Sequence, residues 1–177
     1  EESSVTLLSL HRLAEALNRA KHGIESERML VQLVAVAHRV HGETHRFTAG
    51  VKNALERYKQ RYLFINGDPG KHFLALRYVS AENECVVQGP IVSPRNIEEE
   101  KIVTVHIDEV HPALGTPVIC HGLKDLEIHL NEKIGDVRSL NTAAQKYEVH
   151  FEDKNLEPCL VSSKNMRILF ELPPSEG

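Results

Sequence analysis

Three histidines in the first third of the chain have the spacing of metal ligands on one helix. His38, His41 and His45 stand at positions i, i+3 and i+7, which places their imidazoles near one face. Imidazoles bind zinc, but a zinc site usually adds a carboxylate or thiolate and needs partners that orient the rings. We therefore favour a solvent-facing or helix-capping role for His38 and His41 and a turn role for His45, and we expect no bound metal.

Acid–base groups gather in the middle of the chain. His106 and His111 flank the pair Asp108-Glu109, and an acidic run at 98–100 precedes them. Acidic runs in linkers are usually solvated, and His106 fits the alternation of a strand. The Gly-x-Ser-x-Gly elbow, the His-Glu-x-x-His helix and an Asp-rich metal loop do not occur in the sequence. The sequence therefore predicts a protein that is not an enzyme, with no catalytic residue.

Cysteines and glycines give no sign of a cofactor site. Cys85, Cys120 and Cys159 are far apart, and none belongs to a Cys-x-x-Cys pair, which argues against a disulfide framework or a thiolate zinc site. Residues 67–71 lack the spacing of a phosphate-binding loop. We expect no cofactor and three reduced thiols in a reducing compartment, hence an intracellular, cytoplasmic location. An organelle reached after processing is the alternative.

Composition narrows the class of protein. The 177 residues are 41% hydrophobic and 26% charged, which is ordinary for a globular protein of one medium or two small domains. The formal net charge of −4 argues against general nucleic-acid binding. No apolar run approaches the roughly 18–20 residues of a membrane helix. Because the chain begins without methionine or a signal-like segment, we expect it to be a fragment or processed product of a longer protein.

The spacing of apolar residues predicts three helices in the first third of the chain. Apolar residues recur about every 3.6 positions over 5–20, 24–41 and 47–63, and glycines at 23 and 42 end the first two helices. Short turns between such helices favour antiparallel neighbours. The predicted inner side chains are Leu7, Leu10, Leu13, Ala14 and Leu17, then Met29, Leu30, Leu33, Val36, Ala37 and Val40, then Val51, Ala54, Leu55, Tyr58 and Tyr62.

The turn after the second predicted helix carries a recognisable motif. Gly42, His45 and Thr48 form a Gly-x-x-His-x-x-Thr sequence. Further matching positions are Leu13, Ala14, Leu17, Glu25 and Glu27. On these residues, region 5–63 resembles about one and a half tetratricopeptide repeats of the kinesin-light-chain type. The departures from that pattern are Lys21 for a glycine, Gly23 for an aromatic residue and Arg46 for a proline.

This resemblance implies a surface that binds other proteins. A repeat cannot bury its apolar face alone, so repeats stack and expose a groove that takes extended or helical segments of partners. The candidate groove residues, all on the leading helices of the repeats, are Arg12, Asn18, Lys52, Asn53 and Arg57.

Beyond a dense turn signal at 66–70, the apolar pattern changes to the alternation of strands. Strands are predicted over 72–79, 85–88, 101–107, 117–120, 134–138, 146–151, 158–161 and 166–170. Residues 141–145 should form a hairpin tip, and Gly135 should allow a bend or a close backbone approach. Tyr147, Val149 and Phe151 alternate onto one face, opposite Glu148, His150 and Glu152.

The segment 115–172 resembles a small five-stranded barrel of the Src-homology-like, Tudor-like or KOW-like kind. The residues that carry this resemblance lie in 115–118, 122–123, 130–137, 146–151 and 165–168. A related, degenerate unit is predicted before it, and one larger sheet over 71–172 is the alternative. An aromatic cage for methylated lysine is not expected, because the chain has no Trp and Tyr147 and Phe151 fit a core face.

Together these patterns predict a multi-domain α+β chain. It comprises an antiparallel tetratricopeptide-like helical segment over 1–65, a degenerate β-barrel or opening sheet over 66–114 and a small antiparallel β-barrel over 115–177. The predicted function is a non-enzymatic scaffold, adaptor or structural subunit that binds protein partners through the helical groove. A nucleic-acid-binding module that uses the barrels and a regulatory fragment of a longer enzyme are the alternatives. Partner identity and oligomeric state stay open.

Overall fold

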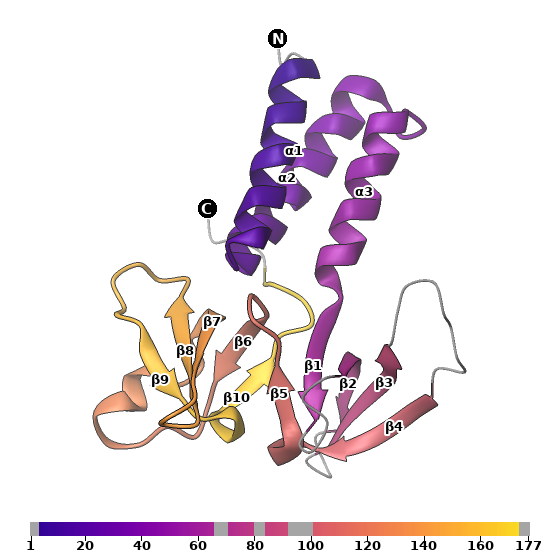
Figure 1. Ribbon diagram of the computed structural model, residues 1–177. Coiled ribbons are helices and arrows are strands. Elements are labelled where there is room, and N and C mark those ends of the chain that lie inside the picture. The colour runs from indigo at the N-terminus through magenta and orange to yellow at the C-terminus, as the bar shows by residue number, and fades with distance from the viewer. Residues whose placement is uncertain (1–3, 66–70, 80–83, 92–100, 174–177) are drawn as a thin grey trace. The chain divides into compact units, whose positions relative to one another are not determined.

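The computed structural model describes residues 4–65, 71–79, 84–91 and 101–173 of the chain. Helices come first and two antiparallel sheets follow, so the architecture is α+β (Figure 1). The chain divides into two compact units, residues 1–59 and 60–177. The predicted turn at 66–70 and the acidic run at 98–100 lie outside the described residues. Within the described ranges, no helix combines the length and apolar character needed to cross a membrane.

The first unit consists of α1 (Ser4–Arg19), α2 (Gly23–His41) and α3 (Arg46–Lys59). The middle helix α2 packs against both α1 and α3 (Figure 1). Helix α3 ends at Lys59, so the prediction that it continues to residue 63 is wrong. The chain continues instead as strand β1 (Arg61–Ile65), because that segment pairs with a strand on each side and its backbone groups are satisfied there.

The core of the helical unit contains fewer buried residues than the sequence predicts. Its buried members are Leu7, Ala14, Leu30, Leu33, Val51, Ala54 and Leu55, with Met29, Val36 and Tyr58 packed partly against them. Three predicted inner residues are instead exposed: Leu10 by 38%, Leu13 by 47% and Val40 by 42%. The apolar stripe of α1 is therefore wider than the surface that α2 covers.

The first sheet has the strand order β4-β3-β2-β1-β5. Its strands are β1, β2 (His72–Val79), β3 (Glu84–Ile91), β4 (Lys101–His106) and β5 (Val110–Pro112). The second sheet has the order β10-β6-β7-β8-β9. Its strands are β6 (Pro117–Cys120), β7 (Ile134–Asn141), β8 (Lys146–Phe151), β9 (Cys159–Val161) and β10 (Met166–Ile168). The strands form two separate sheets, so the alternative prediction of one larger sheet over 71–172 is wrong.

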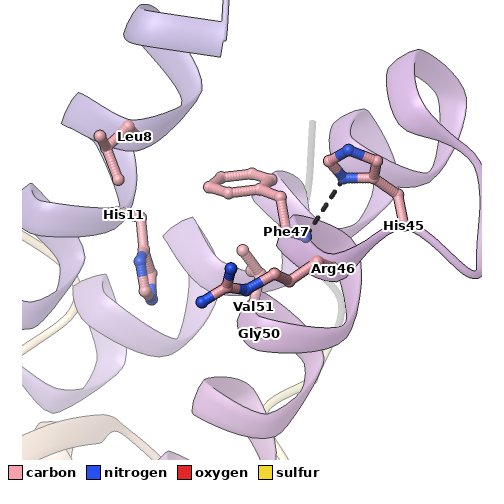
Figure 2. Close-up of a pocket in the computed structure, with 7 residues that line it drawn as sticks. All are labelled: Leu8, His11, His45, Arg46, Phe47, Gly50 and Val51. Atoms are coloured by element: carbon pink, nitrogen blue, oxygen red, sulfur yellow. Dashed lines mark hydrogen bonds between the residues drawn. The ribbon is translucent and has the colours of Figure 1, made fainter.

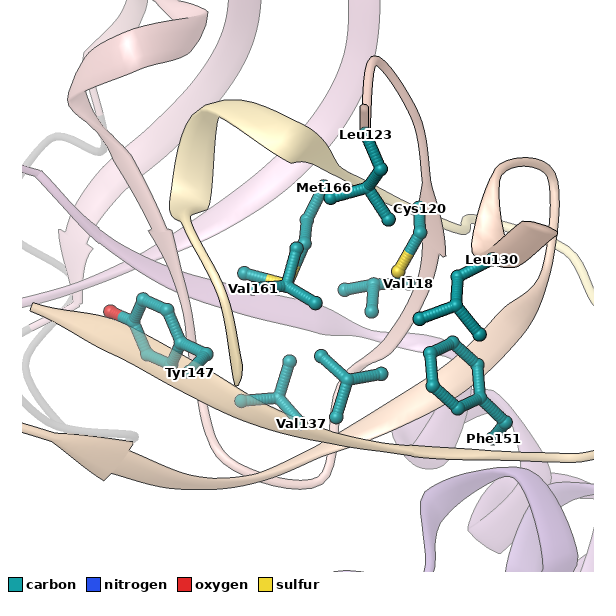
Figure 3. Close-up of a cluster of buried hydrophobic side chains, with 10 residues drawn as sticks. Val118, Cys120, Leu123, Leu130, Val137, Tyr147, Phe151, Val161 and Met166 are labelled. Carbon is teal, nitrogen blue, oxygen red and sulfur yellow. The ribbon is translucent and has the colours of Figure 1, made fainter. Parts of the chain in front are cut away.

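The alternation predicted for β8 is confirmed. Tyr147, Val149 and Phe151 are buried in the cluster of the second sheet, and Figure 3 shows Tyr147 and Phe151 among its side chains. Glu148 and His150 lie on the other face, where they make a hydrogen bond of 3.1 Å. The predicted hairpin tip is also present as a turn after Asn141, and Asn141 Oδ1 accepts a hydrogen bond from the backbone N–H of Ala144.

The end of β10 and the residue after it join the two sheets of the second unit. The Ile168 side chain belongs to the buried cluster of the first sheet, although its backbone pairs with Val118 in the second. The backbone N–H of Ile168 donates to the Tyr78 hydroxyl at 2.8 Å, and Arg61 Nε donates to the Leu169 carbonyl at 2.9 Å. Burial raises the pKa of Tyr78, so this hydroxyl stays protonated.

A second link between the sheets contains a histidine, and it predicts that the stability of the unit depends on pH. His111 Nδ1 on β5 lies 3.1 Å from the Tyr147 hydroxyl on β8, and burial lowers the pKa of His111. Below about pH 6.5, the unfolded chain therefore takes up a proton at this histidine before the folded chain does. The stabilisation that comes from neutral His111 is present above about pH 6.5. It is lost as the pH falls from there through the lowered pKa of the folded state.

We expect His111→Gln to reduce the loss of stability between about pH 7 and about pH 5. The measurement is urea unfolding at both pH values, followed by circular dichroism and tyrosine fluorescence. The quantity to compare is the change in unfolding free energy between the two pH values, in wild type and in His111→Gln. Paired carboxylates such as Glu148 contribute equally to this change in both proteins. An equal pH dependence in wild type and variant would contradict the assignment.

Candidate binding pocket in the helical unit

A pocket of about 400 Å³ opens between α1 and α3. Its lining residues are Leu8 and His11 from α1, and His45, Arg46, Phe47, Gly50 and Val51 from the start of α3 and the turn before it (Figure 2). Helix α2 packs against both of the helices that flank this space.

The turn between α2 and α3 fixes where the pocket residues begin. Gly42 ends α2 with a φ of +85°, a backbone conformation that favours glycine, and its N–H donates to the His38 carbonyl at 2.9 Å. The buried Thr48 hydroxyl lies 2.9 Å from the Gly42 carbonyl oxygen and 3.2 Å from that of Ala37. These contacts tie the first turn of α3 to the last turn of α2.

His45 caps the N-terminus of α3, which agrees with the turn role predicted for it. Its Nδ1 accepts a hydrogen bond of 3.2 Å from the backbone N–H of Phe47, drawn as a dashed line in Figure 2. A helix leaves its first N–H groups without intrahelical partners, and this cap satisfies one of them. The cap fixes the backbone N–H of Phe47 in the first turn of α3. The Phe47 side chain projects from this turn into the pocket.

Phe47 is surrounded by imidazoles. Its ring makes edge-on contacts with His11 and His41, with ring centroids 6.3 Å and 5.9 Å away. The His41 and His45 rings are stacked on each other at 4.6 Å. Among the described residues, no group of three or more His, Cys, Asp or Glu side chains is arranged to hold a metal ion.

The pocket combines an apolar surface with positive or protonatable groups. Leu8, Phe47 and Val51 supply the apolar part, while the side chains with nitrogen are His11, His45 and Arg46. The described lining residues include no acidic side chain. Nε2 of His11 is buried and has no hydrogen-bond partner in the described part of the chain.

The acidic side chain closest along the sequence is already engaged. Glu43 pairs with Lys52 at 2.9 Å, and the hydrogen bond and charge of Lys52 hold the Glu43 pKa below its usual value. The positive character of the pocket edge is therefore available to a ligand, and an apolar group with a neighbouring carboxylate fits this combination.

The five residues predicted for the groove lie on the same two helices but do not line the pocket. Arg12, Asn53 and Arg57 are exposed. Asn18 is half-buried and hydrogen-bonds the Tyr58 side chain, which joins α1 to α3, and Lys52 forms the ion pair with Glu43. Sequence reasoning missed Leu8, His11 and Phe47, which meet only after α2 has brought two distant helices together.

Comparison of the chain with protein-family models, with curated proteins and with solved structures finds no match.

Proposed function

We propose that the chain is a non-enzymatic scaffold or adaptor whose helical unit binds a segment of a partner protein in the pocket between α1 and α3. The observation that carries this proposal is a pocket of about 400 Å³ with an apolar surface and a positive edge. Binding pockets typically have such volumes and combine mostly apolar walls with a few placed polar groups. The resemblance of residues 5–63 to stacked repeats supports the same function.

The chemistry of the pocket defines the kind of segment that it would take. One apolar side chain of the partner would contact Leu8, Phe47 and Val51, and a nearby carboxylate would meet Arg46. Affinity in such grooves comes chiefly from buried apolar anchors, whereas the charged contact adds specificity and faster association. The two sheets, which we propose curl into small barrels, would offer a second contact surface.

The sharpest test fills the pocket without straining the helix. A Cβ at Gly50 would meet nothing within 4 Å, and the residue lies inside α3, so Gly50→Leu should fold and occupy the pocket. Ala49→Leu is the matched control, because Ala49 is exposed on the same helix and does not line the pocket. Peptides selected from a random phage-displayed library on the wild-type chain provide the probes.

We expect the selected peptides to share an apolar residue near an acidic one. Their affinity, measured by fluorescence anisotropy, should fall at least about tenfold for Gly50→Leu and stay unchanged for Ala49→Leu, since about 1.4 kcal/mol corresponds to a factor of ten. Equal binding by wild type and Gly50→Leu would place the site elsewhere. If no peptide is selected while the chain is retained on RNA at low salt, the alternative of nucleic-acid binding gains the stronger support.

A further inference from the structure

The loop between β6 and β7 presents an apolar side chain to solvent. Within this loop, the short 3₁₀ helix η2 (Asp125–Leu130) carries Leu126. Leu126 is 90% exposed, more than any other large apolar side chain that the structure describes, and Ile128 beside it is also exposed. A leucine in water forgoes the free energy that its burial would release. Leu126 is therefore a candidate anchor for a contact with another molecule.

Both ends of this loop are fixed to the core of the second sheet. The side chains of Leu123 and Leu130 belong to its buried cluster, as Figure 3 shows. The Asn131 side chain closes the loop, because its Oδ1 accepts from the Leu123 N–H at 2.8 Å and its Nδ2 donates to the Leu123 carbonyl at 3.0 Å. A loop that is ordered beforehand loses little conformational freedom on binding, so Leu126 is presented ready for a contact.

Carboxylates flank Leu126 on both sides. Asp125 is exposed, so its carboxylate is open to a partner. Glu127 is half-buried, and its Oε1 accepts a hydrogen bond from Cys159 Sγ at 3.6 Å, which holds it beside β9. Lys124 is the one cation in the segment 124–128, so the two carboxylates leave this segment negative. The loop thus combines an exposed apolar side chain with a neighbouring carboxylate.

The pocket between α1 and α3 has the complementary properties. Leu8, Phe47 and Val51 form its apolar part, and Arg46 lies at its edge (Figure 2). The described lining residues include no acidic side chain that would repel the loop. Surfaces of opposite charge attract each other and exclude partners of the same charge. The chain therefore carries both a pocket and an exposed segment with the apolar and acidic character that the pocket requires.

We propose that the segment bound in the pocket is the loop 125–128 of a second copy of this chain. This inference rests on the proposed function, because it names the polypeptide segment that the helical unit takes. Leu126 of one copy contacts Leu8 and Phe47 of the other, and Asp125 accepts a hydrogen bond from Arg46. Each copy supplies one loop and one pocket, so the contact joins two different surfaces and the copies associate through them.

The test is the molar mass of the full chain in solution, measured by sedimentation equilibrium over a wide range of concentrations. We expect the wild-type mass to rise with concentration from 19.9 kDa to at least twice that value. Leu126→Gln removes the anchor of the loop without a change of charge, and Gly50→Leu fills the pocket. Each variant alone should need at least about tenfold higher concentration to associate.

A mixture of the two variants provides the decisive measurement. The Gly50→Leu protein keeps an intact loop, and the Leu126→Gln protein keeps an intact pocket. The equimolar mixture should therefore form pairs of twice 19.9 kDa, and nothing larger, at a concentration where each variant alone stays at 19.9 kDa. A contact made by any other surface would not be restored by mixing.

The matched control is Ile102→Gln, which removes another exposed apolar side chain, 65% exposed on β4, and should associate as the wild type does. Circular dichroism checks that each variant keeps its fold. A wild-type mass that stays at 19.9 kDa at the highest concentration overturns the proposal. A mixture that fails to pair where the wild type associates also overturns it.

The peptide selection described above judges the proposed function separately. Selected peptides that lose affinity for Gly50→Leu, together with a wild-type chain that stays monomeric, would uphold the pocket as a binding site and overturn the second copy as its occupant. Peptides that bind Gly50→Leu and wild type equally, together with unchanged association of Gly50→Leu, would overturn both.

Discussion

Replacing Gly135 by alanine is expected to destabilise the second sheet by about 3 kcal/mol or more. Gly135 lies on β7, paired with Val118 on one side and Phe151 on the other. A Cβ there would come within 2.6 Å of the His150 carbonyl oxygen and 2.7 Å of Val149 Cγ1. The carbonyl belongs to the backbone of β8, so it can move only if the pairing of β7 with β8 is disturbed.

The measurement is urea unfolding followed by tyrosine fluorescence, which reports Tyr147 in the core of this sheet, and by circular dichroism. Gly50→Ala is the matched control, since the same substitution there meets no neighbour within 4 Å and lies in a helix. It should leave stability unchanged or raise it by about 0.5–1 kcal/mol. A Gly135→Ala protein as stable as the wild type would mean that β7 and β8 are further apart than described.

The second large effect is expected at Ile168, where truncation to alanine should cost about 2–5 kcal/mol. The side chain is 4% exposed and lies with Leu63 and Phe73 in the cluster of the first sheet. Its backbone pairs with β6 of the second sheet. The substitution therefore leaves a cavity in the core of the first sheet at a residue whose backbone belongs to the second, and both sheets should become less stable together.

Leu160→Ala provides the control in the same unit, because Leu160 is 37% exposed on β9, at the other end of the strand order of the second sheet. Its cost should stay below about 1 kcal/mol. Unfolding of both variants by urea, followed by fluorescence and circular dichroism, gives the comparison. If Ile168→Ala cost no more than Leu160→Ala, the Ile168 side chain would not be part of the core of the first sheet.

The sequence identified the elements whose pattern is complete within one segment. Strands β2 and β8 have the bounds predicted for them, because their alternation lies within a single run of residues. Strand β1 was missed since Tyr62 continues the helical spacing of Tyr58. Its strand conformation depends on pairing with β2 and β5, which lie further along the chain. Strand β5 was missed because it has three residues and ends in a proline.

The candidate site was less predictable than the fold for a related reason. The turn role of His45 follows from a motif within a few residues, and the structure confirms it as the cap of α3. The pocket itself joins His11 to Phe47, and no local pattern states that these two positions meet. Sequence spacing also placed Leu10 and Leu13 in the core, since periodicity gives the width of an apolar stripe and not the number of neighbours that cover it.

The place of Ile168 in the core of the first sheet has a consequence for the order in which the protein acquires its structure. During synthesis the segment of the first sheet, which ends at Pro112, leaves the ribosome well before Ile168. Its hydrophobic cluster stays incomplete until Ile168 emerges and packs against strands made much earlier. Contacts between such distant positions slow folding and leave apolar surface open in the meantime. The nascent first sheet therefore keeps apolar surface exposed until β10 has been synthesised and packs onto it.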